Sequence, residues 1–172
     1  MKKIYIAVVI AAFCIMMFLS FFPWGRDISI QTVAYEYALD QEEPLAVHEV
    51  TIEGRFTCRV MGQDDFDGTV AISGIPDTQE MTAKVQFWSD RPYGMISYLD
   101  WAGQAHTKEP GFIYCSGDFE QFTIVLLEFS QNGDTQSASW DVETGRVLCA
   151  NAPDHETMLS ASEAVGLKLR EE

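Results

Sequence analysis

Polar and apolar residues alternate with a period of two through much of the chain beyond residue 45. In the segment 50–60, VTIEGRFTCRV, the even positions are apolar or glycine and the odd positions are Thr, Glu or Arg. Successive side chains of a strand point to opposite faces, so this segment predicts a strand with one face in a core. The alternation resumes at 66–72 after a loop short enough for an antiparallel hairpin, and again at 81–87.

Further strands are predicted at 94–101, 111–116, 122–129, 136–142 and 146–149, with turn-forming residues between them. The segment 33–39 fits a strand or one face of a helix, and its aromatic and β-branched content favours a strand. Eight or nine antiparallel strands with short connections predict an all-β meander that forms a barrel or a sandwich. The sequence does not separate these two folds.

A short helix is predicted near the end of the chain, at about 154–165. Apolar residues share one helical face there, Pro153 precedes the segment, and Gly166 stands where a helix would stop. We expect this helix to cover a sheet edge or the mouth of a barrel.

The segment 4–22 carries no charge over 19 residues. As a helix it would be about 28 Å long, enough to cross the core of a bilayer. We therefore predict a cytoplasmic tip and transmembrane signal-anchor helix at 1–26 and an extracytoplasmic domain at 27–172. Lys2 and Lys3 precede the apolar segment and Arg26 follows it, which favours a cytoplasmic amino terminus. The bulky residues at 19–24 favour a retained anchor over a cleaved signal peptide.

The charge of the chain changes the range of possible partners. It holds 26 acidic and 11 basic residues, a formal charge of -15, and every acidic residue follows Arg26. Such a field opposes binding to phosphates, so we expect no nucleic acid partner. It favours cationic partners without specifying one.

Three cysteines lie in the predicted outer domain, Cys58, Cys115 and Cys149. They allow at most one internal disulfide, with three possible pairings, or three free thiols. No zinc, nucleophile-elbow or phosphate-loop motif accompanies them, so we expect no cofactor and no catalytic cysteine. The three histidines, His48, His106 and His155, are scattered singly and are interpreted as surface residues.

Two groups of carboxylates could carry chemistry. Asp65 and Asp67, in the run DDFDG, make half of a calcium-loop pattern without its distal Glu, and a hairpin turn is the simpler interpretation. Asp118 and Glu120, between two predicted strands, are the pair to test for glycoside hydrolysis.

Aromatic residues are the more suggestive candidates for a binding site. Trp88 falls on the face of its strand opposite to Phe87, and Tyr93, Tyr98 and Trp101 follow closely. Together they could line a groove for a sugar, a peptide or another apolar ligand. Packing beneath a loop or the terminal helix is the alternative.

Three segments, VTIEGRF at 50–56, DFDGTVAI at 65–72 and YGMIS at 93–97, resemble small single-span proteins of Gram-positive bacteria. The resemblance covers about a third of the chain, in patterns that hairpins also produce. It implies a cell-surface location and no site residues.

The sequence thus predicts a membrane-tethered, non-catalytic module that binds or senses an extracellular ligand or an envelope protein. A tethered hydrolase and a structural accessory subunit of an envelope complex are the alternatives.

Overall fold

The structure is a computed structural model that describes residues 2–21, 23–60, 62–88, 91–99, 105–106, 111–132 and 135–169. Strands make up 51% of the protein, which confirms the all-β fold class. The strands are β1 (Trp24–Ala38), β2 (Ala46–Cys58), β3 (Asp64–Ile72), β4 (Thr82–Phe87), β5 (Tyr93–Leu99), β6 (Ala105–His106), β7 (Gly111–Cys115), β8 (Phe122–Leu126), β9 (Glu128–Asn132), β10 (Thr135–Ser139) and β11 (Arg146–Ala150). The helices are α1 (Lys2–Phe21), α2 (Pro76–Glu80) and α3 (His155–Ala164).

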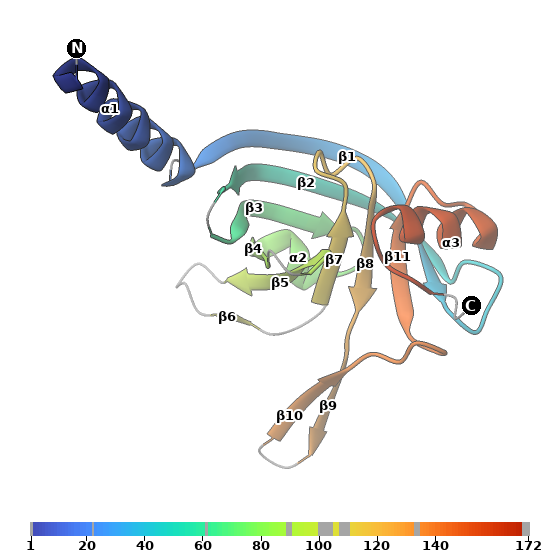
Figure 1. Ribbon diagram of the computed structural model, residues 1–172. Helices are drawn as coiled ribbons and strands as arrows, with labels where there is room; N and C mark the ends of the chain where they lie inside the picture. Colours follow the sequence, from blue (N-terminus) through green and yellow to red (C-terminus); the bar gives the residue numbers. More distant parts are fainter. Residues whose placement is uncertain are drawn as a thin grey trace.

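Eight of these strands form a closed antiparallel barrel (Figure 1). Around the barrel the order is β4, β3, β2, β1, β11, β8, β7 and β5, and β5 pairs with β4 to close the ring. Neighbours in the chain are therefore neighbours in space, as a meander predicts. The first strand meets the last one, from Ala34 opposite Ala150 to Ala38 opposite Arg146, and this pairing makes a barrel rather than a sandwich.

The first strand is longer than the sequence indicated. The predicted strand at 33–39 is only the end of β1, which pairs with β2 from Trp24 opposite Cys58 to Glu36 opposite Ala46. Ile28 is buried in the barrel core and Ile30 packs against it. The barrel thus begins before Asp27, inside the segment assigned to the anchor, because Trp24, Gly25 and Arg26 already belong to the sheet.

Apolar side chains fill the interior of the barrel. An eight-stranded barrel leaves room for little else. The larger fully buried residues of this core are Ile52, Phe66, Ile72, Tyr98, Ile113, Phe119, Phe122, Ile124, Leu126 and Leu148. They come from the inward positions of the strands and from one loop, so the core is held by packing from every side.

The two ends of the barrel close differently. At the end where β7 passes to β8, the loop residue Phe119 turns its ring into the interior and is 1% exposed. Near the opposite end, the short helix α2 follows β3, and Ile75 and Met81 on either side of it pack against the core. The hydroxyl of Thr78 donates to the backbone oxygen of Ile75 at 2.7 Å and accepts from the amide of Ile72 at 2.8 Å, which fixes the turn.

Helix α3 packs against the outer wall of the barrel, so the predicted position at an edge or a mouth is wrong. Asp154 caps it by accepting from the amide of Thr157 at 2.9 Å. Beneath it lies a second apolar cluster, and its buried members are Tyr37, Val125, Val147, Cys149, Ala152, Met158 and Leu167. The helix is needed there because β8 is buried on both faces along its whole length, as its continuous apolar sequence indicated.

A two-stranded hairpin of β9 and β10 projects from the barrel between β8 and β11 (Figure 1). The sequence predicted one continuous strand at 122–129, but β8 ends at Leu126 and β9 starts at Glu128. The strand predicted at 136–142 ends at Ser139, and a turn leads from there into β11.

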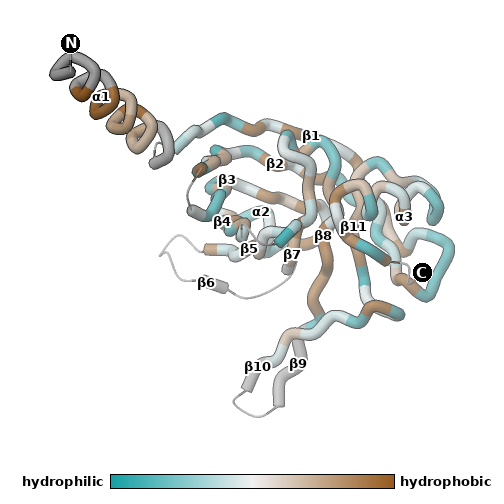
Figure 2. Tube along the Cα trace, in the orientation of Figure 1, coloured by the Kyte–Doolittle hydropathy of each residue, from teal (hydrophilic) through white to brown (hydrophobic). Residues whose placement is uncertain are grey.

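Helix α1 stands apart from the barrel at the start of β1 (Figure 1). Its described side chains are apolar (Figure 2). They are exposed, for example those of Ile10, Phe13 and Ile15. Within the described ranges of the chain, no helix is both long enough and apolar enough to span a membrane. The transmembrane helix stays a prediction.

Candidate functional site

Three charged or ionisable side chains meet on the inner face of β1, β2 and β11. Ala34 of β1 lies opposite His48, and Ala38 of β1 lies opposite Arg146, so Glu36 stands between these two positions on the same face. Glu36 is 8% exposed and His48 is 12% exposed in their side chains. A carboxylate this deeply buried requires partners that supply hydrogen bonds and positive charge.

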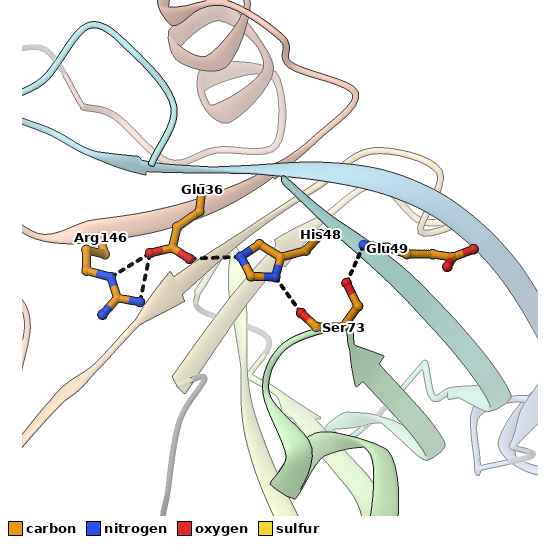
Figure 3. A network of polar contacts seen from close by, with 5 residues as sticks. All are labelled: Glu36, His48, Glu49, Ser73 and Arg146. Atoms are coloured by element: carbon orange, nitrogen blue, oxygen red, sulfur yellow. Dashed lines mark hydrogen bonds and ion pairs between the residues drawn. The ribbon is translucent and has the colours of Figure 1, made fainter. Parts of the chain in front are cut away.

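Both partners are present (Figure 3). Arg146 donates from Nε and Nη2 to Oε1 of Glu36, at 2.8 and 2.7 Å. Nε2 of His48 lies 2.9 Å from Oε2 of the same carboxylate, and its Nδ1 contacts the backbone oxygen of Ser73. Both ring nitrogens thus face oxygen atoms. The network joins Arg146 and His48 to one carboxylate.

This arrangement holds the strands together. Each oxygen of Glu36 accepts a hydrogen bond or contacts a ring nitrogen, and both nitrogens of His48 lie against oxygen atoms. The network ties three strands to the turn that follows β3. The interpretation of His48 as a surface residue is therefore wrong. Its even position, in register with the inward residues Val50 and Ile52, was the signal that sequence reasoning missed.

Two of the four predicted aromatic ligands lie together outside the barrel core. The rings of Trp88 and Tyr93 meet edge to face at 6.4 Å, and the guanidinium of Arg91 lies over both, 5.6 and 5.7 Å from the ring centroids. Arg91 also donates to the hydroxyl of Tyr93 at 2.8 Å. Stacking of this kind holds a cation against aromatic faces.

The aromatic contacts continue along the outer wall of β7. Tyr93 packs against Phe112 and Tyr114, with ring centroids 5.0 and 5.2 Å apart. Burial, and then the neighbouring Tyr93, raise the pKa of Tyr114. Phe112 and Tyr114 pack against the apolar cluster under α3, whereas Trp88 and Tyr93 stay half-buried at its border. We call Trp88, Arg91, Tyr93, Phe112 and Tyr114 the outer aromatic cluster.

The other two predicted ligands do not join this cluster. Tyr98 points into the barrel, where its hydroxyl donates to the backbone oxygen of Val70 at 2.7 Å and burial raises its pKa. The prediction that Tyr98 lines a groove is wrong, because it lies five positions after Tyr93, so the two side chains lie on opposite faces of β5. Trp101 lies outside the described residues.

All four cysteines lie in the described part of the chain, and all are free thiols. Cys58 is exposed, whereas burial raises the pKa of Cys115 to about 12. Cys149 is buried under α3, 3.4 Å from the hydroxyl of Thr123. It faces outward while Cys115 packs against the barrel core, so the wall of the barrel separates these two thiols. Burial raises the pKa of Cys58 and Cys149 as well, so none of these three barrel thiols has the lowered pKa of a reactive thiolate.

Asp65 and Asp67 lie in a shallow surface pocket of about 190 Å³ beside β3 and β4. Asp65 pairs with Arg59, and Asp67 lies 3.7 Å from Nζ of Lys84. Among the residues that the structure describes, no group of three or more His, Cys, Asp or Glu side chains is placed to hold a metal ion. The two carboxylates therefore act in ion pairs along the strand.

No family model matches the chain, and no curated protein or solved structure shows significant similarity to it. The fold and the sites define an eight-stranded antiparallel barrel with a filled core.

Proposed function

We propose that this protein is a membrane-anchored, extracytoplasmic β-barrel that binds a ligand or an envelope protein without catalysing a reaction. The observation that carries the proposal is the apolar surface of α1. Ile10, Phe13 and Ile15 are 57%, 59% and 60% exposed on a helix that stands apart from the barrel. Apolar side chains gathered in this way need a cover, and a lipid bilayer supplies one for an uncharged segment of 19 residues.

The orientation follows from charge. Lys2 and Lys3 precede the apolar segment, and Arg26 follows it. Lysine and arginine favour the cytoplasmic side, so the barrel lies outside. The resemblance to single-span proteins of Gram-positive bacteria supports the same location.

The partner of this proposal binds on the outer wall of the barrel, because apolar side chains occupy the interior. The outer aromatic cluster is the best surface for it. Trp88 and Tyr93 are half-buried there, and rigid aromatic side chains give large contact area at small entropic cost. The acidic charge of the domain favours a partner with basic groups.

The hydrolase alternative is not supported by its best carboxylate pair. The hydrogen bond from Ser116 holds the pKa of the exposed Asp118 below its usual value, and the amide of Glu120 and the charge of Arg26 also lower it. A general acid needs the opposite shift.

The accessory-subunit alternative is favoured by one specific observation. In the described part of the chain, β9 and β10 pair only with each other, so each strand leaves an edge open. An open edge can accept a strand from another protein.

Membrane attachment is tested by alkaline extraction of membranes from cells that express the full chain. We expect the protein to stay in the membrane pellet and the double variant Ile10→Lys, Phe13→Lys to leave it, because each lysine at the centre of a span opposes insertion by about 3 kcal/mol. Val47→Lys on the outer wall of the barrel is the control and should stay in the pellet. Release of the unmodified protein by alkali would contradict the proposal.

Binding through the outer aromatic cluster is tested with a photo-crosslinking amino acid at position 93 in intact cells, compared with the same amino acid at the exposed position 142. Cross-linked products that form at 93 and not at 142 support the proposal. Equal products at both positions, or none at 93, contradict it.

A further inference from the structure

The loop 116–121 between β7 and β8 inserts one side chain into the end of the barrel. The ring of Phe119 lies 5.6 Å from that of Phe56, 5.4 Å from that of Phe66 and 6.0 Å from that of Phe87, measured between centroids. These three phenylalanines come from β2, β3 and β4, so they form an aromatic box that Phe119 fills. On either side of Phe119 in the loop, Asp118 and Glu120 are exposed.

The loop is bonded to itself and not to the strands around it. The amide of Ser116 donates to the backbone oxygen of Gln121 at 2.8 Å, and the amide of Phe119 donates to that of Ser116 at 2.9 Å. Asp118 accepts from the hydroxyl of Ser116 and the amide of Glu120. Every hydrogen bond described for residues 117–120 thus has its partner inside the loop, so the loop could swing outward with these bonds intact. It would lose the packing of the Phe119 ring and the attraction between Asp118 and Arg26.

The backbone of Phe119 has an unusual conformation. Its φ is 64°, in the left-handed region that a bulky L-residue rarely adopts. Strained backbone of this kind persists only where surrounding contacts impose it, and it is often found at ligand clamps and switches. The contacts that hold it here are the packing of the ring in the aromatic box and the hydrogen bond from the amide of Phe119 to Ser116.

A cation stands beside the box. The guanidinium carbon of Arg26 lies 5.4 Å from the ring centroid of Phe56, and a Cβ placed on Gly117 would lie 3.9 Å from its Nη2. Its charge also acts on the carboxylate of Asp118. The loop therefore presents an apolar ring to an aromatic box and, one residue away, a carboxylate near an arginine.

We propose that this end of the barrel is a binding site for a small amphiphile with an apolar tail and one carboxylate, and that Asp118 and Phe119 occupy the site as an internal pseudo-ligand. The tail takes the place of the Phe119 ring among Phe56, Phe66 and Phe87, and the carboxylate pairs with Arg26.

The exchange keeps the contacts of the site. One carboxylate replaces another beside Arg26, while Asp118 stays in the acidic domain, so the complex carries one negative charge more than the free protein and binding should strengthen with added salt. The apolar contacts of the Phe119 ring are replaced by those of the ligand tail with the same three phenylalanines. The site is distinct from the outer aromatic cluster, and the inference goes beyond the proposed function.

The test uses the full chain in nanodiscs of zwitterionic lipid and the water-soluble probe 4-phenylbutyrate, with binding followed by ligand-observed NMR against empty nanodiscs. The neutral 4-phenyl-1-butanol is the matched control. We expect Phe119→Gly to bind the carboxylate about tenfold more tightly than the unmodified protein, because no ring has to be displaced and glycine adopts a positive φ freely. In that variant, Arg26→Gln should weaken binding of the carboxylate about tenfold and leave binding of the alcohol unchanged.

Asp118→Asn keeps the test decisive if Phe119→Gly does not fold, because Asp118 is exposed and its loss disturbs no packing. It removes the competing carboxylate, so binding of 4-phenylbutyrate should tighten severalfold while binding of the alcohol does not change. The proposal is overturned if neither variant binds the carboxylate more tightly than the unmodified protein. It is equally overturned if the alcohol binds as well as the carboxylate with or without Arg26, since the site would then be only an apolar cavity.

Discussion

Oε2 of Glu36 lies 2.9 Å from Nε2 of His48, across the first hairpin of the barrel and on its inner face. Arg146 binds the other oxygen of the same carboxylate, so Glu36 joins the first, second and last strands of the barrel. The barrel closes where its last strand, β11, pairs with its first, β1, and this network lies at that pairing.

Glu36→Gln should therefore destabilise the protein. The amide leaves the partly buried guanidinium of Arg146 without a counter-charge and weakens the contact with His48, and removal of one partner from such a network costs about 3 kcal/mol. Denaturant unfolding measures the change in the free energy of unfolding. Glu53→Gln, on the exposed face of β2, is the matched control and should change it by less than about 0.5 kcal/mol. Equal effects of the two substitutions would show that the network is not stabilising.

At position 119 a glycine variant should be more stable than an alanine variant, the reverse of the usual order. Phe119→Ala removes a buried ring and should cost about 3 to 5 kcal/mol. Phe119→Gly removes the same ring, but the φ of 64° suits glycine, so this variant should be about 1 kcal/mol more stable than the alanine variant. Thermal and denaturant unfolding of the two variants compare them directly. A more stable alanine variant would mean that the backbone at 119 is not held in the left-handed region.

Asp154 should make the stability of α3 depend on pH. Its pKa lies below the usual 3.8, chiefly because the amide of Thr157 donates to it. A carboxyl group whose pKa is lowered by folding stabilises the fold at neutral pH, and this contribution is lost as the pH falls through its folded value. The advantage of the unmodified protein over Asp154→Ala should thus shrink below pH 3.8, as melting temperatures at pH 7 and pH 2.5 would show. An advantage that stays constant would exclude a role for the charged cap.

The three cysteines of the barrel should react with N-ethylmaleimide in the order of their exposure. Cys58 is exposed, Cys115 is half-buried with a pKa of about 12, and Cys149 is buried. At pH 8 only the small thiolate fraction reacts, so Cys115 should lag behind Cys58, and Cys149 should react only after unfolding. Peptide mapping by mass spectrometry follows each thiol separately. Rapid labelling of Cys149 in the folded protein would contradict the position of α3.

The alternation of polar and apolar residues predicted most of the strands of the barrel. The even residues of 50–60 face inward from Val50 to Phe56, as the period of two requires, and the continuous apolar run of β8 predicted cover on both faces. The pairing of β1 with β11 joins residues more than 100 positions apart, and no local pattern encodes it. The start of β1 was missed because Trp24 and Arg26 follow directly on the apolar segment and were assigned to it.

The sites were harder to predict because they depend on which face a residue occupies. Tyr93 and Tyr98 are close in sequence but lie on opposite faces of one strand. The position of His48 in the same inward register as Val50 would have placed it inside the barrel. Phe119 stands in a polar turn, SGDFEQ, where a lone aromatic residue is the only local sign. Its role appears only once the barrel is closed around the space that it fills.

The most direct test of the proposed function is the accessibility of two introduced cysteines in intact cells, in a Cys58→Ser background. Val142→Cys, in an exposed turn of the barrel, should react with a membrane-impermeant maleimide before any permeabilisation. Lys3→Cys should react only after it. Labelling of position 3 in intact cells, or of position 142 only after lysis, would contradict a barrel held outside the cell by α1.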